Sequence, residues 1–372
     1  MAAPFDLLAV WGGPGSGPGQ FNSPSGTTTD SAGNTYVADT FNHRIQVFDA
    51  CHRWVASRGE LGTAAGQLNA PHGVAVDSHD DLYLADTNNN RVQAFEPAGG
   101  LLAHWGSLGS GVGSFKLPFA IAVDSQDRIY VADTDNHRIQ VFDASGGFLA
   151  AWGRFGSGNG QFNTPFDLAL DAEDRVYVAD TLNQRIQVFD SAGNFLRKGG
   201  KFGSANGQFS SPRGVAVDSR GNVYVADTNN SRIQVFDTTG AFVSKWGGAG
   251  SEPGQFRFAS GVDIDPRGNV YVAETHPNHR IQVFGEPPPT IADLGTSIGA
   301  LELPHGTANS LLAKLASAAR SLERGQLGPT THKLGAFVAE IEAQHGKKLL
   351  ESAAEALLEE AQEVIDSLAC LG

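Results

Sequence analysis

The sequence predicts a mainly β fold, a six-bladed propeller followed by a small helical bundle. A Tyr-Val-Ala-Asp tetrapeptide and its variants recur with a period of 47 residues, and glycine occupies 46 of the 372 positions. Turn-rich repeats of this length are typical of stacked β-sheets rather than of a disordered chain. The acidic residue that ends each tetrapeptide is Asp39, Asp86, Asp133, Asp180, Asp227 and Glu274.

Each repeat contains four strand-like segments separated by turn residues. In the fifth repeat we expect strands at residues 215–218, 223–227, 232–237 and 241–246, with Ser-Arg-Gly-Asn and Thr-Thr-Gly between them. A four-stranded sheet with apolar residues on both faces cannot shield itself from water. Neighbouring sheets must therefore stack face to face around a common axis.

The two ends of the repeat region complement each other. Residues 5–11 match only the last strand of a repeat, whereas the sixth repeat stops at residues 281–284 and lacks that strand. We therefore expect residues 5–11 to join the sheet formed by residues 261–285. This pairing closes the ring and leaves no unprotected sheet edge.

The repeats resemble the NHL repeat family. The resemblance covers about residues 5–285 and rests on Gly-Gln-Phe-Asn-Ser-Pro, Val-Tyr-Val-Ala-Asp-Thr-x-Asn-x-Arg-Ile-Gln-Val-Phe-Asp and Trp-Gly. It implies a six-bladed propeller whose relatives mostly bind proteins, RNA or carbohydrate, with enzymes as a minority branch. It implies no particular ligand.

Acidic residues that recur in every repeat are interpreted as structural, because a catalytic site would occur once. The acid of each tetrapeptide is expected to pair with an arginine of the following loop through charge-assisted hydrogen bonds. A second set of acids is expected to open the turn after the first strand. The arginines are Arg44, Arg91, Arg138, Arg185, Arg232 and Arg280, and the turn acids are Asp30, Asp77, Asp124, Asp171, Asp218 and Asp265.

Departures from the repeat mark a candidate ligand site at the mouth of the central channel. Aromatic and charged residues follow the loop proline in three repeats and a histidine does so in another, and one acidic residue stands where the other repeats have Gly or Ala. Together they form a plausible small pocket. Neutral drift at an exposed ring is the alternative. The candidates are His72, Phe119, Phe166, Asp167 and Arg213.

Asp263 is a further candidate, because Asp263 and Thr28 replace the alanine of the other repeats. A buried carboxylate needs a partner or a raised pKa. We expect Asp263 to bond to Thr28, with an ion ligand or a perturbed acid as the alternative.

An outer ring on the same face could contact a partner protein. His43, His137 and His279 occupy equivalent places in different repeats and do not converge, so no zinc site is expected. The ring consists of Phe41, His43, Asn88, Asn90, Asp135, His137, Leu182, Gln184, Asn229, Ser231, His276 and His279.

A domain boundary is expected where Glu286 and Pro287–Pro289 end the repeats. We assign residues 1–286 to the propeller, 287–290 to a linker and 291–372 to a helical bundle with three helices or four. Leu-Leu-Ala-Lys-Leu, Ala-Phe-Val and Gly346-Lys347-Lys348-Leu349 make about residues 291–371 similar to FIMAH domains. That resemblance implies an extracellular or surface-located bacterial protein. The bundle either packs on the propeller or mediates self-association.

The formal net charge of −14 disfavours nucleic-acid binding, which relies on Lys and Arg. No secretory signal and no membrane-spanning stretch is visible, although this does not settle the compartment. Cys51 and Cys370 are expected to be two unrelated thiols, with a single bridge as the alternative.

We expect a noncatalytic module for binding or scaffolding, without a cofactor or metal. The alternative is a metal-dependent hydrolase or lyase with its site in the central channel. His72, Asp167, Arg213 and Asp263 are a thin set for that chemistry, which needs three protein ligands and an open position.

Overall fold

A computed structural model describes residues 5–301, 303–345 and 349–371. The chain divides into two compact units, Met1–Glu286 and Pro287–Gly372. The first unit is formed by strands and the second by helices, as expected. Each unit is described by itself.

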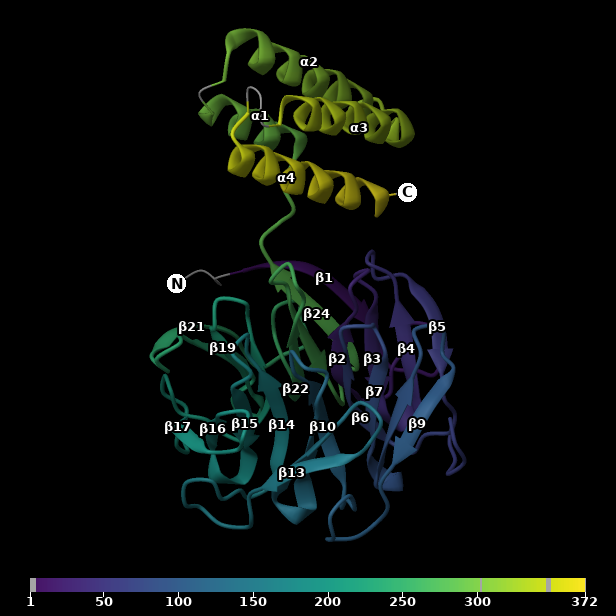
Figure 1. Ribbon diagram of the computed structural model, residues 1–372, viewed down its shortest axis with the longest axis vertical. Helices are drawn as coiled ribbons and strands as arrows, with labels where there is room; N and C mark the ends of the chain where they lie inside the picture. Colours follow the sequence, from purple (N-terminus) through teal and green to yellow (C-terminus); the bar gives the residue numbers. More distant parts are fainter. Residues whose placement is uncertain (1–4, 302, 346–348, 372) are drawn as a thin grey trace. The chain divides into compact units, whose positions relative to one another are not determined.

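The first unit consists of six antiparallel four-stranded sheets, numbered here as blades 1–6 (Figure 1). Blade 1 contains β2 (Pro24–Thr29), β3 (Thr35–Asp39), β4 (Arg44–Phe48) and β5 (Trp54–Arg58). Blade 2 contains β6 (Pro71–Val76), β7 (Leu82–Asp86), β8 (Arg91–Phe95) and β9 (Leu101–Trp105). Blade 3 contains β10 (Pro118–Val123), β11 (Ile129–Asp133), β12 (Arg138–Phe142) and β13 (Phe148–Trp152).

Blade 4 contains β14 (Pro165–Leu170), β15 (Val176–Asp180), β16 (Arg185–Phe189) and β17 (Phe195–Gly199). Blade 5 contains β18 (Pro212–Val217), β19 (Val223–Asp227), β20 (Arg232–Phe236) and β21 (Phe242–Gly247). Its four strands confirm those expected for the fifth repeat, although the first begins three residues earlier, at the loop proline. In blades 1–5 a 3₁₀ turn joins the second strand to the third: η1 (Thr40–Asn42), η2 (Thr87–Asn89), η3 (Thr134–Asn136), η4 (Thr181–Asn183) and η5 (Thr228–Asn230).

The two ends of the propeller segment meet in blade 6. This sheet contains β22 (Ala259–Ile264), β23 (Val270–Glu274), β24 (Arg280–Gly285) and β1 (Asp6–Gly12). The register of β1 on β24 runs from Asp6 opposite Gly285 to Gly12 opposite Arg280. Figure 1 shows the purple β1 beside the green β24. The predicted closure of the ring by the N-terminal strand is confirmed.

The apolar core lies between the blades, because the second strand of each blade is buried on both faces. In β11, Tyr130 and Ala132 belong to the cluster shared with blade 4, whereas Ile129 and Val131 belong to the cluster shared with blade 2. Successive strand residues point to opposite faces of a sheet. One apolar strand therefore contributes to two interfaces, which explains why the repeats read as continuous Val-Tyr-Val-Ala runs.

The recurring acid and arginine form a structural network, as predicted. In blade 3, Asp133 accepts hydrogen bonds from the backbone N–H of Lys116 (2.7 Å) and from the side chains of Asn136 (2.9 Å), Arg138 (2.7 Å) and Gln140 (3.1 Å). The carboxylate is fully buried, while its arginine reaches the surface. The network thus ties the loop after the second strand to the loop that precedes the first.

The turn acids also have the predicted role. Asp30 accepts the backbone N–H groups of Ala32 (3.1 Å) and Asn34 (2.8 Å), which closes the turn after β2. The other carboxylate oxygen accepts the hydroxyl of Tyr36. These contacts leave the turn acid with a structural function.

Hydrogen bonds between neighbouring blades come from the threonine that follows each tetrapeptide. The Thr40 hydroxyl donates to the carbonyl oxygen of Pro71 in the next blade at 2.8 Å. Sequence reasoning did not identify this contact, although the threonine recurs in every repeat. The same bond joins Thr87 to Pro118, Thr134 to Pro165, Thr181 to Pro212 and Thr228 to Ala259.

A tryptophan near the end of the fourth strand packs between adjacent blades. The ring of Trp105 lies 6.4 Å from Tyr83 of its own blade and 5.8 Å from Phe142 of the next. We call the four residues of this type the wedge tryptophans: Trp11, Trp105, Trp152 and Trp246. Blade 1 has Arg58 and blade 4 has Gly199 at the corresponding position.

The second unit contains four helices: α1 (Ile291–Ala300), α2 (His305–Leu322), α3 (Leu327–Gln344) and α4 (Glu351–Ala369). Thr290 and Asp293 form a reciprocal capping box at the start of α1. All four helices contribute to one apolar core, including Leu294, Leu315 and Phe337. None of the described helices is both long enough and apolar enough to cross a membrane.

Residues 346–348 of the motif used for the C-terminal resemblance lie outside the described residues. Cys51 and Cys370 are both disulfide-bonded in the structure, so the expectation of two unrelated thiols is wrong.

Candidate functional site

The predicted site lies at the inner strands, where the residue after the loop proline faces the mouth of the central channel. A cavity of about 30 Å³ remains there. This volume holds about one or two water molecules. Its lining consists of Ser25, Gly26, His72, Gly73, Phe119, Ala120, Phe166, Asp167, Ser260 and Gly261.

Four planar groups form a continuous arc around this mouth. The rings of His72 and Phe119 are 4.3 Å apart, and those of Phe119 and Phe166 are 4.6 Å apart. The guanidinium carbon of Arg213 lies 5.1 Å from the centre of the Phe166 ring. We call His72, Phe119, Phe166 and Arg213 the mouth arc. The structure therefore brings four of the six candidate residues into contact as tilted neighbours, and Asp167 lines the same cavity.

His72 is a neutral member of this arc. Its Nδ1 lies 3.0 Å from the carbonyl oxygen of Ala70, which can only accept a hydrogen bond, so Nδ1 carries the proton. Burial, together with the charge of Arg213, lowers the pKa of His72 to about 4. At neutral pH the Nε2 atom is consequently an acceptor.

Asp167 links two inner strands. One carboxylate oxygen accepts the backbone N–H of Leu168 (2.9 Å), and the other accepts that of Val215 in blade 5 (2.9 Å). Burial raises the pKa of Asp167 to about 7, against the lowering effect of these two hydrogen bonds. The side chain is half-buried and lines the cavity. Both oxygens are already engaged within the protein.

The position of Asp167 is one at which side chains are normally excluded. A Cβ atom at Gly214, its equivalent in blade 5, would lie 2.7 Å from the carbonyl oxygen of Ser260, and one at Gly261 would lie 2.0 Å from that of Ser25. Asp167 fits because its carboxylate bonds to the backbone that it approaches.

Asp263 is not among the residues that line the cavity, and it follows the lining residue Gly261 by two positions on β22. Burial, together with the charges of Asp265 and Asp167, raises the pKa of Asp263 to about 8. The carboxyl accepts the backbone N–H of Ile264. Among residues 5–301 no hydrogen bond joins it to Thr28, which differs from the expected pairing.

The outer ring is in large part structural. The Nδ1 atom of His279 accepts the backbone N–H of Ser23 in blade 1 (2.8 Å), and that of His43 accepts the N–H of Ala70 in blade 2 (3.0 Å). These side chains connect each blade to the loop of the next. Asn90, His137 and Gln184 accept the equivalent N–H groups of Leu117, Thr164 and Ser211.

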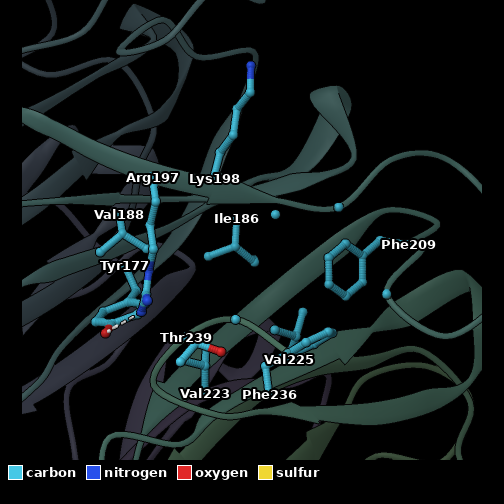
Figure 2. Close-up of a pocket in the computed structure, with 14 residues that line it drawn as sticks. Tyr177, Ile186, Val188, Arg197, Lys198, Phe209, Val223, Val225, Phe236 and Thr239 are labelled. Carbon is cyan, nitrogen blue, oxygen red and sulfur yellow. Dashed lines mark hydrogen bonds between the residues drawn. The ribbon is translucent and has the colours of Figure 1, made fainter. Parts of the chain in front are cut away.

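A larger cavity of about 150 Å³ lies between blades 4 and 5 (Figure 2). Gly199 and Gly200 contribute to its wall, together with apolar side chains of both blades. The sequence analysis did not identify this cavity. The feature of the sequence that could have indicated the cavity is Gly199, which stands in the fourth repeat where other repeats have a wedge tryptophan.

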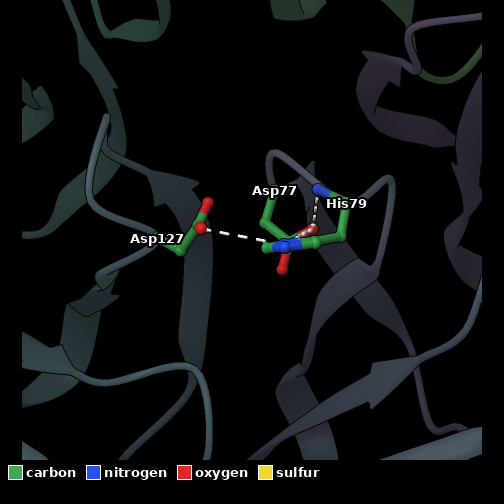
Figure 3. Close-up of side chains that lie close together, drawn as sticks. All are labelled: Asp77, His79 and Asp127. Atoms are coloured by element: carbon green, nitrogen blue, oxygen red, sulfur yellow. Dashed lines mark hydrogen bonds and ion pairs between the residues drawn. The ribbon is translucent and has the colours of Figure 1, made fainter.

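Asp77, His79 and Asp127 form a group of possible metal ligands at the turns of blades 2 and 3 (Figure 3). The exposed His79 ring lies 4.0 Å from Asp77 and 3.8 Å from Asp127. Asp77 already accepts two backbone N–H groups of its own turn, and Asp127 accepts the backbone N–H and hydroxyl of Ser78. These hydrogen bonds connect the turn of blade 2 to the turn of blade 3.

Comparison with known proteins agrees with the repeat structure. The NHL repeat matches residues 21–48, 68–95, 115–142, 162–189, 209–236 and 256–284, and the FIMAH domain matches residues 292–366. The human NHL repeat-containing protein 3 is 49% identical over 49 residues. That match spans 13% of this chain and 14% of the human protein.

Solved structures share the fold at low sequence identity. A streptogramin B lyase is 14% identical with a TM-score of 0.53, covering 71% of this chain and 94% of the lyase. A gluconolactonase from Xanthomonas campestris is 15% identical with a TM-score of 0.54, covering 73% of this chain and 88% of that enzyme. The chain is thus a six-bladed β-propeller of NHL repeats that carries a C-terminal FIMAH domain.

Proposed function

We propose that the propeller is a noncatalytic binding module that recognises an acidic group of a protein partner at the mouth arc. The tilted rings of His72, Phe119 and Phe166, which line a cavity of only about 30 Å³ at the mouth, carry this proposal. Pockets that enclose small ligands usually measure roughly 300–1,000 Å³. A mouth of this size suits a protruding side chain better than an enclosed substrate.

Arg213 supplies the chemistry of recognition. Its guanidinium stacks on Phe166, and within residues 5–301 it makes no ion pair or hydrogen bond to a protein group. Desolvation lowers the pKa of Arg213, yet an arginine remains charged in proteins. A partly buried cation without a counter-charge is stabilised by a carboxylate, which its planar fork can bind with two hydrogen bonds.

The test compares Arg213→Ser with the unmodified protein, because Ser25 and Ser260 occupy this position in blades 1 and 6. Peptide arrays with matched Glu/Gln and Asp/Asn pairs serve as probes. We expect selected acidic peptides to bind, their amide versions to bind at least about tenfold more weakly, and Arg213→Ser to lose the difference. Arg220→Ser makes the same charge change at the opposite end of blade 5 and should have no effect. Binding that ignores these changes would refute the proposal.

A metal-dependent hydrolase or lyase remains the second candidate. Asp263, with a pKa of about 8, and the neutral His72 have the perturbed acid–base properties that are common in active sites. The test measures hydrolysis of lactones with added Ca²⁺, Mg²⁺, Mn²⁺ or Zn²⁺. Metal-dependent turnover that disappears in Asp263→Asn would replace the binding proposal.

We propose an extracellular or surface location, supported by the FIMAH match and by two disulfide-bonded cysteines, which persist in oxidising compartments. Self-association through the helical unit is a separate proposal. Fractionation of the native cells tests the first, and light scattering of the protein with and without residues 287–372 tests the second. A cytosolic protein with reduced cysteines would contradict the proposed location. The same oligomeric state with and without residues 287–372 would contradict self-association through the helical unit.

A further inference from the structure

The interface between blades 4 and 5 lacks the side chain that fills equivalent interfaces. Gly199 lies opposite Ile186, in the register where Trp152 lies opposite Ile139 and Trp246 opposite Ile233. The glycine therefore occupies the position of a wedge tryptophan in the same sheet geometry. The cavity between blades 4 and 5 lies where that side chain is missing.

Both walls of this space are open. An added Cβ atom at Gly199 would have no atom within 4 Å, and neither would one at Gly240 in the facing turn of blade 5. In the preceding interface, a Cβ atom at Gly193 would lie 2.5 Å from a ring carbon of Trp152. The facing turns are thus shaped to accept an aromatic ring, and at blades 4 and 5 the ring is missing.

Two apolar side chains keep slightly more accessible surface than their equivalents as a result. Ile186 retains 7% of its accessible surface, compared with 0% for Ile139 and Ile233. Phe236, which faces the cavity from blade 5, retains 9%, compared with 0% for Phe189 in the interface filled by Trp152. The cavity of about 150 Å³ is lined by Ile186, Val188, Phe209, Val223, Val225 and Phe236.

Arg197 fills only one side of the space. Its guanidinium lies 5.9 Å from the centre of the Tyr177 ring and donates to the Tyr177 hydroxyl at 3.2 Å and to the carbonyl oxygen of Thr238. Figure 2 shows Arg197 extending to Tyr177, while Lys198 points away from the other labelled side chains. The tyrosine face that a wedge tryptophan would contact is thus covered, but the Phe236 face is not.

We propose that this cavity binds one planar aromatic ring of a free small molecule, in the place that a wedge tryptophan occupies elsewhere. Apolar cavities of roughly 150 Å³ bind benzene-sized ligands, because the ring gains contacts with the side chains that line the space. The space lies between two stacked blades beneath Arg197 and the turn at Gly240, which fits a small molecule better than a chain segment. This inference is independent of the mouth arc.

The test uses indole as the probe and calorimetry with the full-length protein. We expect one site per chain, with a dissociation constant on the order of 1 mM or tighter, as ligand efficiency allows for a ring of this size. Gly199→Trp should weaken indole binding at least about tenfold, because the new side chain occupies the cavity. Lys201→Ala, at an exposed residue that does not line the cavity, should bind as the unmodified protein does.

Two further variants keep the proposal testable if Gly199→Trp does not fold. Gly199→Leu fills part of the cavity with a smaller side chain and should also weaken binding, whereas Trp152→Gly should create a second indole site between blades 3 and 4. Circular dichroism checks that each variant is folded. The proposal is overturned if indole does not bind saturably, if folded Gly199→Trp binds it unchanged, or if only tryptophan-containing peptides bind.

Discussion

Replacing Asp133 by alanine should strongly destabilise blade 3. The carboxylate is fully buried and accepts one backbone N–H and three side-chain donors. Asn136 and Gln140 have a second acceptor each, in Gly109 and Ser114, but the N–H of Lys116 loses its acceptor. Arg138 also loses its counter-charge.

The loss amounts to about 3–5 kcal/mol, the usual cost of removing one partner of a buried ion pair. It is a large part of the roughly 5–15 kcal/mol that stabilises a typical protein. Asp143→Ala is the matched control, because Asp143 accepts three hydrogen bonds in a surface turn of the same blade, where water can replace it. We expect about 1 kcal/mol or less for the control.

Urea unfolding followed by tryptophan fluorescence measures both variants. The midpoint should shift much further for Asp133→Ala than for Asp143→Ala, with the slope of free energy against urea unchanged. Equal shifts for the two variants would refute the interpretation of the recurring acid and arginine as a buried structural network.

Three further outcomes are expected. Deleting residues 1–12 removes β1 and Trp11 from blade 6 and should lower the thermal midpoint of the propeller by several degrees at least, because the ring loses its closing strand. A variant that melts like the full chain would contradict the closure. Asp263 holds its proton in the folded state up to about pH 8, but in the unfolded chain only to about pH 4, so the free energy of unfolding should fall as the pH rises between these values. Asp263→Asn should reduce the slope of the unfolding free energy against pH by up to about 1.4 kcal/mol per pH unit. Urea unfolding of the variant and the unmodified protein at pH 5 and pH 8 measures this difference. The same pH dependence in both proteins would contradict the reasoning. Alkylation of the unreduced, unfolded protein should label neither Cys51 nor Cys370 in mass spectra, whereas two labelled cysteines would show that the disulfide is absent.

The architecture was predictable because the same strand and turn pattern recurs in every repeat. A single Tyr-Val-Ala-Asp strand is ambiguous, but six copies at a fixed period define blades, and the missing fourth strand of blade 6 identifies β1 as its partner. The network around Asp133 followed from the same repetition. Local spacing was sufficient for this network, since its contacts lie within one repeat and its preceding loop.

Contacts between blades were harder to predict from the sequence. Thr40 and His43 bond to residues of the next repeat, and nothing in their own spacing indicates that neighbour. The candidate site shows the same limit. Sequence comparison found the mouth arc as a set of deviations, but it could not show that Asp167 bonds to Val215 or that Asp263 is not among the residues that line the cavity. Those facts depend on how the inner strands pack around the channel.

The pairing of Asp6 with Gly285 has a consequence for the order of folding during synthesis. Blades 1–5 are built from neighbouring strands, so each can form soon after its own repeat leaves the ribosome. β1, which precedes the other strands of the propeller, must instead wait for the last of them, and closing so long a loop is slow. Until then, the outer edge of β1 and the wedge side of Trp11 stay exposed. Ring closure is therefore the step at which a growing chain is most open to pairing with a second copy of itself.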